Sequence, residues 1–123
     1  MKCFNKSIGS YGETLAESHL KCLGYTILHK NFTCSLGEID IVCRKDNIIC
    51  FVEVKSRFSN TFGHPCEAIN YKKRIQLLKL SKYYIHKFNL RNFNYRFDAL
   101  EVSFDMNYST PIINFITDAF RFY

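Results

Sequence analysis

The 123-residue sequence predicts a single α/β domain, residues 1–123, whose mixed central sheet is flanked by helices in the order αβββαββ. Two segments carry apolar residues at helical spacing, and five others are rich in β-branched and aromatic residues between turn residues. A composition that is 47% hydrophobic and 16% aromatic is typical of a chain that buries a core. Helices and strands that interleave in this way pack as layers around a sheet.

The first helix is expected over residues 10–23, because Gly24 suits the left-handed backbone position that follows a helix. Glu13, in its first turn, has two interpretations. With Ser10 it fits a capping box, in which its carboxylate bonds the start of the helix. Alternatively, it has the role at a functional site that resemblance to a known family implies. The two roles do not exclude each other, and both stay open.

A strand is expected over residues 25–32, followed by a β-hairpin whose strands cover residues 36–45 and 48–56. Asp46 and Asn47 form the turn, because both residue types tolerate left-handed backbone. Near this turn the hairpin is apolar on both sides. Such a hairpin is typical of the middle of a layered domain.

The position of the turn determines which residues face each other across the hairpin. Counting back from it places Asp40 opposite Glu53, and Glu38 opposite Lys55. Facing residues share one side of a sheet and side chains alternate along a strand, so all four charged groups are expected on one face.

Two carboxylates at facing positions repel each other, because their Cβ atoms are roughly 4.5–5.5 Å apart. A divalent cation between Asp40 and Glu53 would remove this repulsion, and Mg²⁺ prefers such oxygen ligands. Lys55 would then hold a water molecule or a phosphate oxygen beside the ion. The competing interpretation is an exposed edge with an ion pair between Glu38 and Lys55, which would contribute roughly 0–1 kcal/mol.

The second helix is expected over residues 67–88, after a polar loop at 56–66 in which an ordinary loop role is favoured for His64. Residues 68–97 hold eight of the 17 Lys and Arg and none of the 11 Asp and Glu. Solvated faces normally mix both signs, so this stretch favours contact with phosphate. The tyrosines of the helix stand at core spacing, which does not predict base stacking. The residues expected to bind nucleic acid are Arg57, Lys72, Lys73, Arg74 and Lys79.

Two further strands are expected over residues 95–104 and 112–117. Asp98, in the first of them, has two interpretations. It pairs with Arg96 or Lys55 and supports the site, or it lies on the surface.

Composition also narrows the class of protein. The chain has no signal-peptide pattern and no apolar run of about 18 residues, so a cytoplasmic protein without a membrane partner is expected. The six cysteines form no CxxC pair and no zinc-like spacing with the four histidines, so reduced thiols are expected. The hairpin register makes Cys43 and Cys50 neighbours.

Several motifs together resemble one known family. Glu13 on the first helix, Gly-Glu-Ile-Asp at 37–40 and Phe-Val-Glu-Val-Lys-Ser-Arg at 51–57 look like the small endonuclease-like bacterial family called YraN-like. That family is distantly similar to archaeal Holliday junction resolvases of the PD-(D/E)xK nuclease superfamily. Ile39 stands where the superfamily label has proline, as it does in the resembled family. The other matching residues are Gly12, Gly24, Tyr25, Asn31, Gly63, Pro65, Arg96, Phe97, Asp98, Ala119 and Phe120.

This resemblance implies a three-layer restriction-endonuclease-like core and a Mg²⁺- or Mn²⁺-dependent nuclease acting on DNA, branched DNA included. In that scheme Asp40, Glu53 and the Val54 carbonyl bind the ion, Lys55 orients or helps to deprotonate the attacking water, and Glu13 completes the outer shell. Two alternatives stay open, a non-catalytic nucleic-acid- or protein-binding module and a structural partner in a larger complex. Pairing of two chains as a homodimer is also left open.

Overall fold

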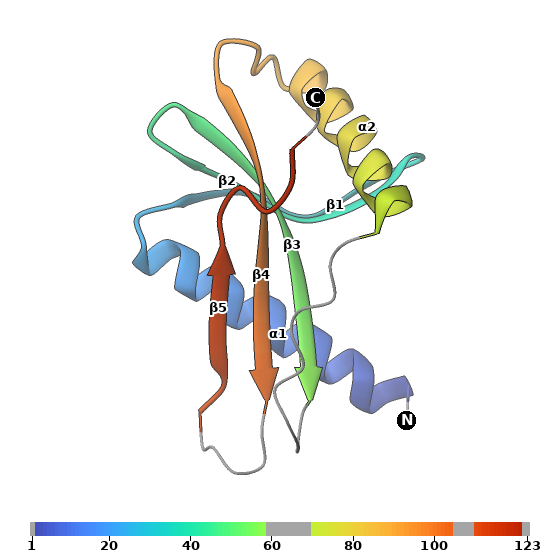
Figure 1. Ribbon diagram of the computed structural model, residues 1–123, viewed down its shortest axis with the longest axis vertical. Coiled ribbons are helices and arrows are strands. Elements are labelled where there is room, and N and C mark those ends of the chain that lie inside the picture. The colour runs from blue at the N-terminus through green and yellow to red at the C-terminus, as the bar shows by residue number, and fades with distance from the viewer. Residues whose placement is uncertain (1, 59–69, 105–109, 122–123) are drawn as a thin grey trace.

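The computed structural model describes residues 2–58, 70–104 and 110–121, and it confirms the αβββαββ order and the mixed sheet (Figure 1). The elements are α1 (Lys2–Cys22), β1 (Thr26–Cys34), β2 (Gly37–Lys45), β3 (Ile48–Phe58), α2 (Tyr71–Lys87), β4 (Asn94–Phe104) and β5 (Ile112–Ile116).

The five strands lie side by side in the order in which they occur in the chain. Neighbouring strands are antiparallel except β3 and β4, which are parallel and are connected through α2. In Figure 1, α1 crosses behind the sheet and α2 lies on the other side, near β1. The two helices therefore cover opposite faces, which gives three layers.

Each face of the sheet has its own apolar core. Residues that alternate along a strand point to opposite faces, so neighbouring hairpin residues belong to different cores. The core beneath α2 contains Phe32, Ile39, Val42, Ile49, Phe51, Leu77, Leu80, Tyr84, Ala99 and Phe120. The core above α1 contains Ala16, Leu20, Tyr25, Ile41, Cys43, Cys50, Val52, Leu100 and Val102.

The first helix differs from its prediction, because it begins at Lys2 and not at residue 10. Ser10 is therefore an interior helical residue whose carbonyl accepts a hydrogen bond from the Thr14 hydroxyl, 3.1 Å away. The capping-box interpretation of Glu13 is wrong, since a capping serine has non-helical backbone. The misleading pattern was Ser10 followed three residues later by Glu13, which matches a capping box but lies inside the helix.

Other boundaries move by a few residues. Strand β3 extends to Phe58, because it pairs with β4 over its whole length, so residues 56–58 are strand and not loop. Helix α2 begins at Tyr71, preceded by Asn70, whose side-chain oxygen accepts the Lys73 amide hydrogen at 2.8 Å and caps the helix. The predicted loop beyond residue 58, His64 and the predicted helical residues 67–69 lie outside the described residues.

The predicted surface placement of Asp98 is wrong, because this residue is fully buried. Its carboxylate accepts two hydrogen bonds from Arg96, at 2.8 and 2.9 Å, and one from the Asp118 amide at 2.8 Å. Arg96 also donates to the Tyr25 hydroxyl at 2.7 Å. Pairing with Arg96 is thus confirmed, and every partner has good geometry, as a buried charge requires.

No helix in residues 2–58, 70–104 or 110–121 combines the length and the apolar character that crossing a membrane requires.

Helix α1 approaches β3 most closely at a glycine. Gly12 is buried, and a Cβ atom there would lie 1.8 Å from the Ser56 Oγ and 3.0 Å from the Ser56 Cβ. The hydroxyl can rotate away from an added methyl group, but the Cβ moves only with the strand. Gly12 therefore sets the distance between α1 and β3, and with it the position of Glu13.

We expect Gly12→Ala to lower the free energy of unfolding by about 1–2 kcal/mol, because overpacking outweighs the helix propensity gained. Chemical denaturation measures the change. Combining it with Ser56→Gly should restore most of the loss, and Ser18→Ala on the exposed side of α1 serves as the control. A Gly12→Ala protein as stable as the wild type would contradict the close approach.

Candidate metal centre

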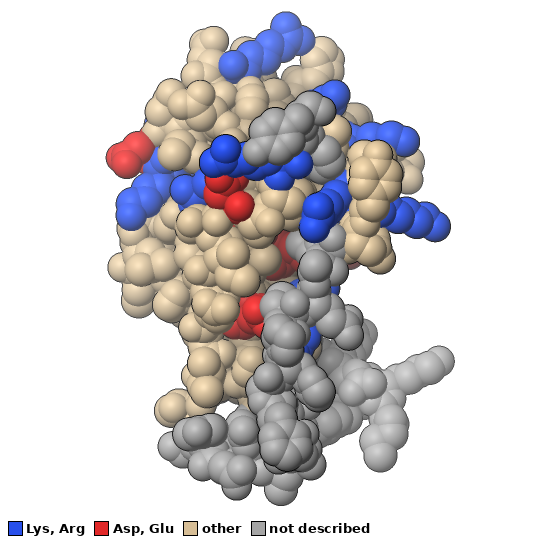
Figure 2. Space-filling view, in the orientation of Figure 1, with Lys and Arg blue, Asp and Glu red and all other residues tan. Residues whose placement is uncertain are grey.

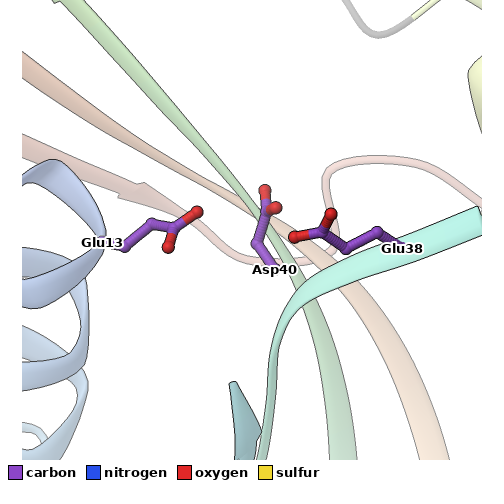
Figure 3. Close-up of side chains that lie close together, drawn as sticks. All are labelled: Glu13, Glu38 and Asp40. Carbon is purple, nitrogen blue, oxygen red and sulfur yellow. The ribbon is translucent and has the colours of Figure 1, made fainter. Parts of the chain in front are cut away.

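Three carboxylates from two elements point toward one another (Figure 3). Glu13 comes from α1, and Glu38 and Asp40 come from β2. One oxygen from each lies within 4.8 Å of the others. Glu13 and Asp40 are half-buried, whereas Glu38 is exposed, so the cluster opens to solvent on one side. The spacing and the oxygen donors suit a hard divalent cation.

Asp40 lies where two strands separate. The predicted hairpin register is confirmed from Lys45 opposite Ile48 to Ile41 opposite Val52. Beyond that last pair, β2 pairs only with β1, and β3 pairs only with β4. The Val54 amide, which β2 no longer pairs with, donates instead to the Asp40 side chain at 2.8 Å. This hydrogen bond orients the Asp40 carboxylate.

Glu53 has one compensated and one uncompensated oxygen. Its Oε1 lies 3.7 Å from the Lys73 ammonium of α2. Its Oε2 is buried and accepts no hydrogen bond from any residue that the structure describes. Leaving a buried acceptor unpaired costs about 1–3 kcal/mol, and more for a charged group. A bound cation would remove that cost.

The acids also disturb each other's ionisation. Burial raises the pKa of Asp40 to about 7, and the charge of Glu53 adds to this effect, while the hydrogen bond from Val54 opposes it. Burial also raises the pKa of Glu53, and the charges of Lys73 and Lys55 oppose this effect. Asp40 and Glu53 therefore lie close enough to interact, and the charge of Glu53 destabilises the ionised form of Asp40.

The predicted pairing of Glu38 with Lys55 across the hairpin is wrong. The last pair between β2 and β3 is Ile41 with Val52, so Glu38 has no partner on β3. Glu38 instead pairs with Thr33 of β1. Because β2 departs from β3, Ile39 lies in the core under α2. Alternation along the strand predicts it on the same side as Ile41. Glu38, to which the sequence assigned no role at the site, thus joins Glu13 and Asp40.

Asn31 also belongs to this cluster, and sequence reasoning gave it no role. It lies in β1 between the residues that pair with Ile41 and Ile39, and its φ of 53° is left-handed. In the amide orientation that satisfies both neighbours, its nitrogen donates to Glu38 at 3.0 Å and to Glu13 at 3.2 Å. Asparagine is depleted in strands, so its presence inside β1 was a signal that could have marked this position.

Lys55 follows Glu53 by two residues on β3 and has a buried acid as its register partner. Lys55 is half-buried on β3, and its charge lowers the pKa of Glu53. Its register partner on β4 is Glu101, which is only 7% exposed. No pattern in the sequence pointed to Glu101, because the parallel pairing of β3 with β4 depends on the crossover through α2.

The predicted basic residues lie in three different places. Lys72, Lys73 and Lys79 line a groove beside the acidic cluster, whereas the Arg74 guanidinium lies 5.7 Å from the ring of Phe120. Arg57 is half-buried near the end of β3. Figure 2 shows basic side chains gathered over α2, with acidic side chains nearer the middle of the same face.

The Val54 carbonyl stays a predicted ligand.

Comparison with known proteins identifies close relatives. The profile of the uncharacterised protein family UPF0102 matches residues 12–102. A UPF0102 protein of Clostridium perfringens is 53% identical over 98% of this chain and 99% of its own. Those of Clostridium acetobutylicum and Clostridium kluyveri are 48% and 46% identical, over the same shares of each chain. These relatives span nearly the whole length of the chain, α1 and the acidic cluster included.

We expect Asp40→Asn to stabilise the metal-free protein, and more so at pH 8 than at pH 5. The pKa of Asp40 is about 7 in the fold against an ordinary 3.8, so ionisation is disfavoured there. The wild type therefore loses stability as pH rises from about 4 through about 7, and the amide does not. The gain at pH 8 should be on the order of 1–3 kcal/mol in chemical denaturation with EDTA. Glu17→Gln is the control, and a gain independent of pH would contradict this account.

Proposed function

This chain belongs to the uncharacterised protein family UPF0102, and we propose that it is a metal-dependent nuclease that hydrolyses phosphodiester bonds in DNA. One observation carries the proposal: acids from α1, β2 and β3 gather around Asp40, and one buried oxygen of Glu53 has no partner among the described residues. A purely structural cluster would be expected to satisfy that oxygen.

The donor set fits Mg²⁺ or Mn²⁺. Asp40 and Glu53 would bind the ion, with the Val54 carbonyl as a further ligand, and Glu13 and Glu38 would complete the acidic surroundings. All of these donors are oxygen atoms, as such ions prefer, and no cysteine or histidine among the described residues belongs to the cluster. When bound, the ion would stabilise the negative charge that develops on the phosphate and lower the pKa of the attacking water.

The chain's own residues would orient the reactants. The Val54 amide holds Asp40 in one direction, and Asn31 holds Glu38 and Glu13. Lys55, two residues beyond Glu53 on the same side of β3, would donate a hydrogen bond to the attacking water or to a phosphate oxygen. Groups held in place before the reaction cost no reorganisation during it.

The basic residues would bind the backbone of the nucleic acid. Lys73 reaches Glu53 from the first turn of α2, so a phosphate that it contacts lies next to the acidic cluster. Lys72 and Lys79 extend the positive surface along the same helix. Lysine contacts to phosphate position a strand without reading its sequence, so little sequence preference is expected.

We expect the purified protein to cleave single-stranded, flap or four-way-junction DNA in the presence of Mg²⁺ or Mn²⁺. Glu53→Gln should lower the cleavage rate by roughly 100-fold or more, because it removes a charged ligand of the ion. Gel analysis of labelled DNA measures the rate. Glu17→Gln, one turn after Glu13 on α1, should cleave like the wild type. Unchanged cleavage by Glu53→Gln would rule out this site.

Cation binding has a readout that does not depend on cleavage. Titration calorimetry with Mn²⁺ and no DNA should detect a site that is lost in Asp40→Asn and kept in Glu17→Gln. DNA binding that is steep in salt and indifferent to EDTA, without cleavage, would instead favour a non-catalytic binding module.

A further inference from the structure

A groove of about 760 Å³ lies between the β1–β2 turn and the N-terminal half of α2. Its size is within the range of pockets that hold small ligands, of roughly 300–1,000 Å³. The residues that line it are Ser35, Leu36, Asn70, Tyr71, Lys72, Lys73, Ile75, Gln76 and Lys79.

The groove is positively charged and adjoins the candidate metal centre through Lys73. Lys72, Lys73 and Lys79 line it, and its described lining contains no acid. The Lys73 ammonium lies 3.7 Å from the Glu53 carboxylate, so the two sites share a boundary. Charge complementarity therefore favours an anionic occupant, and the position favours a chain of phosphates that extends to Glu53.

An exposed aromatic ring stands in the same groove. Tyr71 is 76% exposed, compared with 41% for Tyr83 on the same helix. The sequence placed Tyr71 in the apolar row of α2, but it is the first residue of the helix, and the buried row begins only at Leu77. Leu36, on the opposite wall, is 40% exposed. A ring so exposed contributes little to the core and is free to stack on a ligand.

The amide side chains of the groove already make internal hydrogen bonds. The Gln76 nitrogen donates to the Leu36 carbonyl at 3.1 Å, which ties α2 to the β1–β2 turn. The Asn70 oxygen accepts the Lys73 amide hydrogen as the helix cap. Both bonds restrict these amides from reading base edges. The walls therefore suit stacking and phosphate contact better than base-specific recognition.

We propose that this groove binds an unpaired segment of nucleic acid, with a base stacked on Tyr71 and phosphates on Lys72 and Lys79. A base inside a duplex has both faces covered by its neighbours, so only an unpaired base offers a free face to the ring. This inference rests on the proposed nuclease function and narrows it to strands with unpaired nucleotides beside the cut. The bound segment would lead along Lys73 to the acidic cluster.

Binding is tested in EDTA, where no cleavage interferes. Fluorescence anisotropy with a labelled oligothymidylate of about 12 nucleotides should give an affinity that Tyr71→Ala lowers roughly five-fold or more. Tyr71→Phe keeps the ring and should bind within about two-fold of the wild type. Tyr83→Ala is the matched control on the same helix, outside the groove, and should bind like the wild type. Thermal unfolding of each variant verifies that it is folded.

Salt dependence and base stacking give independent measurements. Lys72→Gln and Lys79→Gln should each reduce the slope of log affinity against log salt by about 0.7, the value for one phosphate contact on a single strand. Quenching of a 2-aminopurine base in the oligonucleotide should occur with the wild type and Tyr71→Phe but not with Tyr71→Ala.

Equal affinity of the wild type and Tyr71→Ala would overturn the inference. So would tighter binding of a matched duplex, or no binding of either DNA. If single strands bind through Tyr71 but Glu53→Gln and the wild type give the same cleavage or none, the groove is supported and the nuclease proposal fails. If cleavage depends on Glu53 while Tyr71→Ala binds normally, the nuclease proposal is supported and the groove fails.

Discussion

The hydrogen bond from the Val54 amide to the Asp40 carboxylate lies where β2 and β3 part, and the rest of the site depends on that separation. Up to Ile41 and Val52 the two strands form an ordinary antiparallel ladder. Past that pair, β2 follows β1 and β3 follows β4, so the acids of β2 are no longer confined to the side of the sheet facing α2. Glu13 on α1 and Glu53 on β3 can then approach the same carboxylate, although the two helices cover opposite faces.

The acids of this region are costly to keep ionised, and a bound cation would reduce that cost. Four acids stand near one another, and burial and mutual repulsion raise the pKa of Asp40 to about 7. The nearby lysines offset only part of this electrostatic cost. Lys73 lies near one oxygen of Glu53, and the other oxygen has no partner among the described residues. Natural proteins commonly retain such destabilising groups where function needs them. The burial of apolar residues in the cores on both faces of the sheet stabilises the fold and offsets this destabilisation.

Helix α2 contributes to both the core and the surface. Leu77, Leu80 and Tyr84 pack against the sheet, and this packing holds the first turn of the helix beside Glu53. Among the lysines of that end, Lys73 compensates one oxygen of Glu53, whereas Lys72 and Lys79 line the groove. Gln76 links the helix to the β1–β2 turn, and a side chain at Gly37 would meet the Gln76 nitrogen at 2.5 Å. The groove walls are thus held together by a hydrogen bond and a close contact.

The sequence alone determined the fold class, the hairpin and its register from the turn to Ile41 and Val52. These features follow from local patterns, since alternation and a two-residue turn decide which residues face each other. The predicted facing pair of Asp40 and Glu53 lies just beyond the last pair of that ladder, although the charge of Glu53 still acts on Asp40. Glu13 entered through family resemblance and not through spacing. Only the tertiary structure decided that Glu38 and Asn31 join the cluster, that Glu101 lies beside Lys55, and that Tyr71 is exposed. Each of these depends on where separate elements meet, which short-range sequence patterns do not encode.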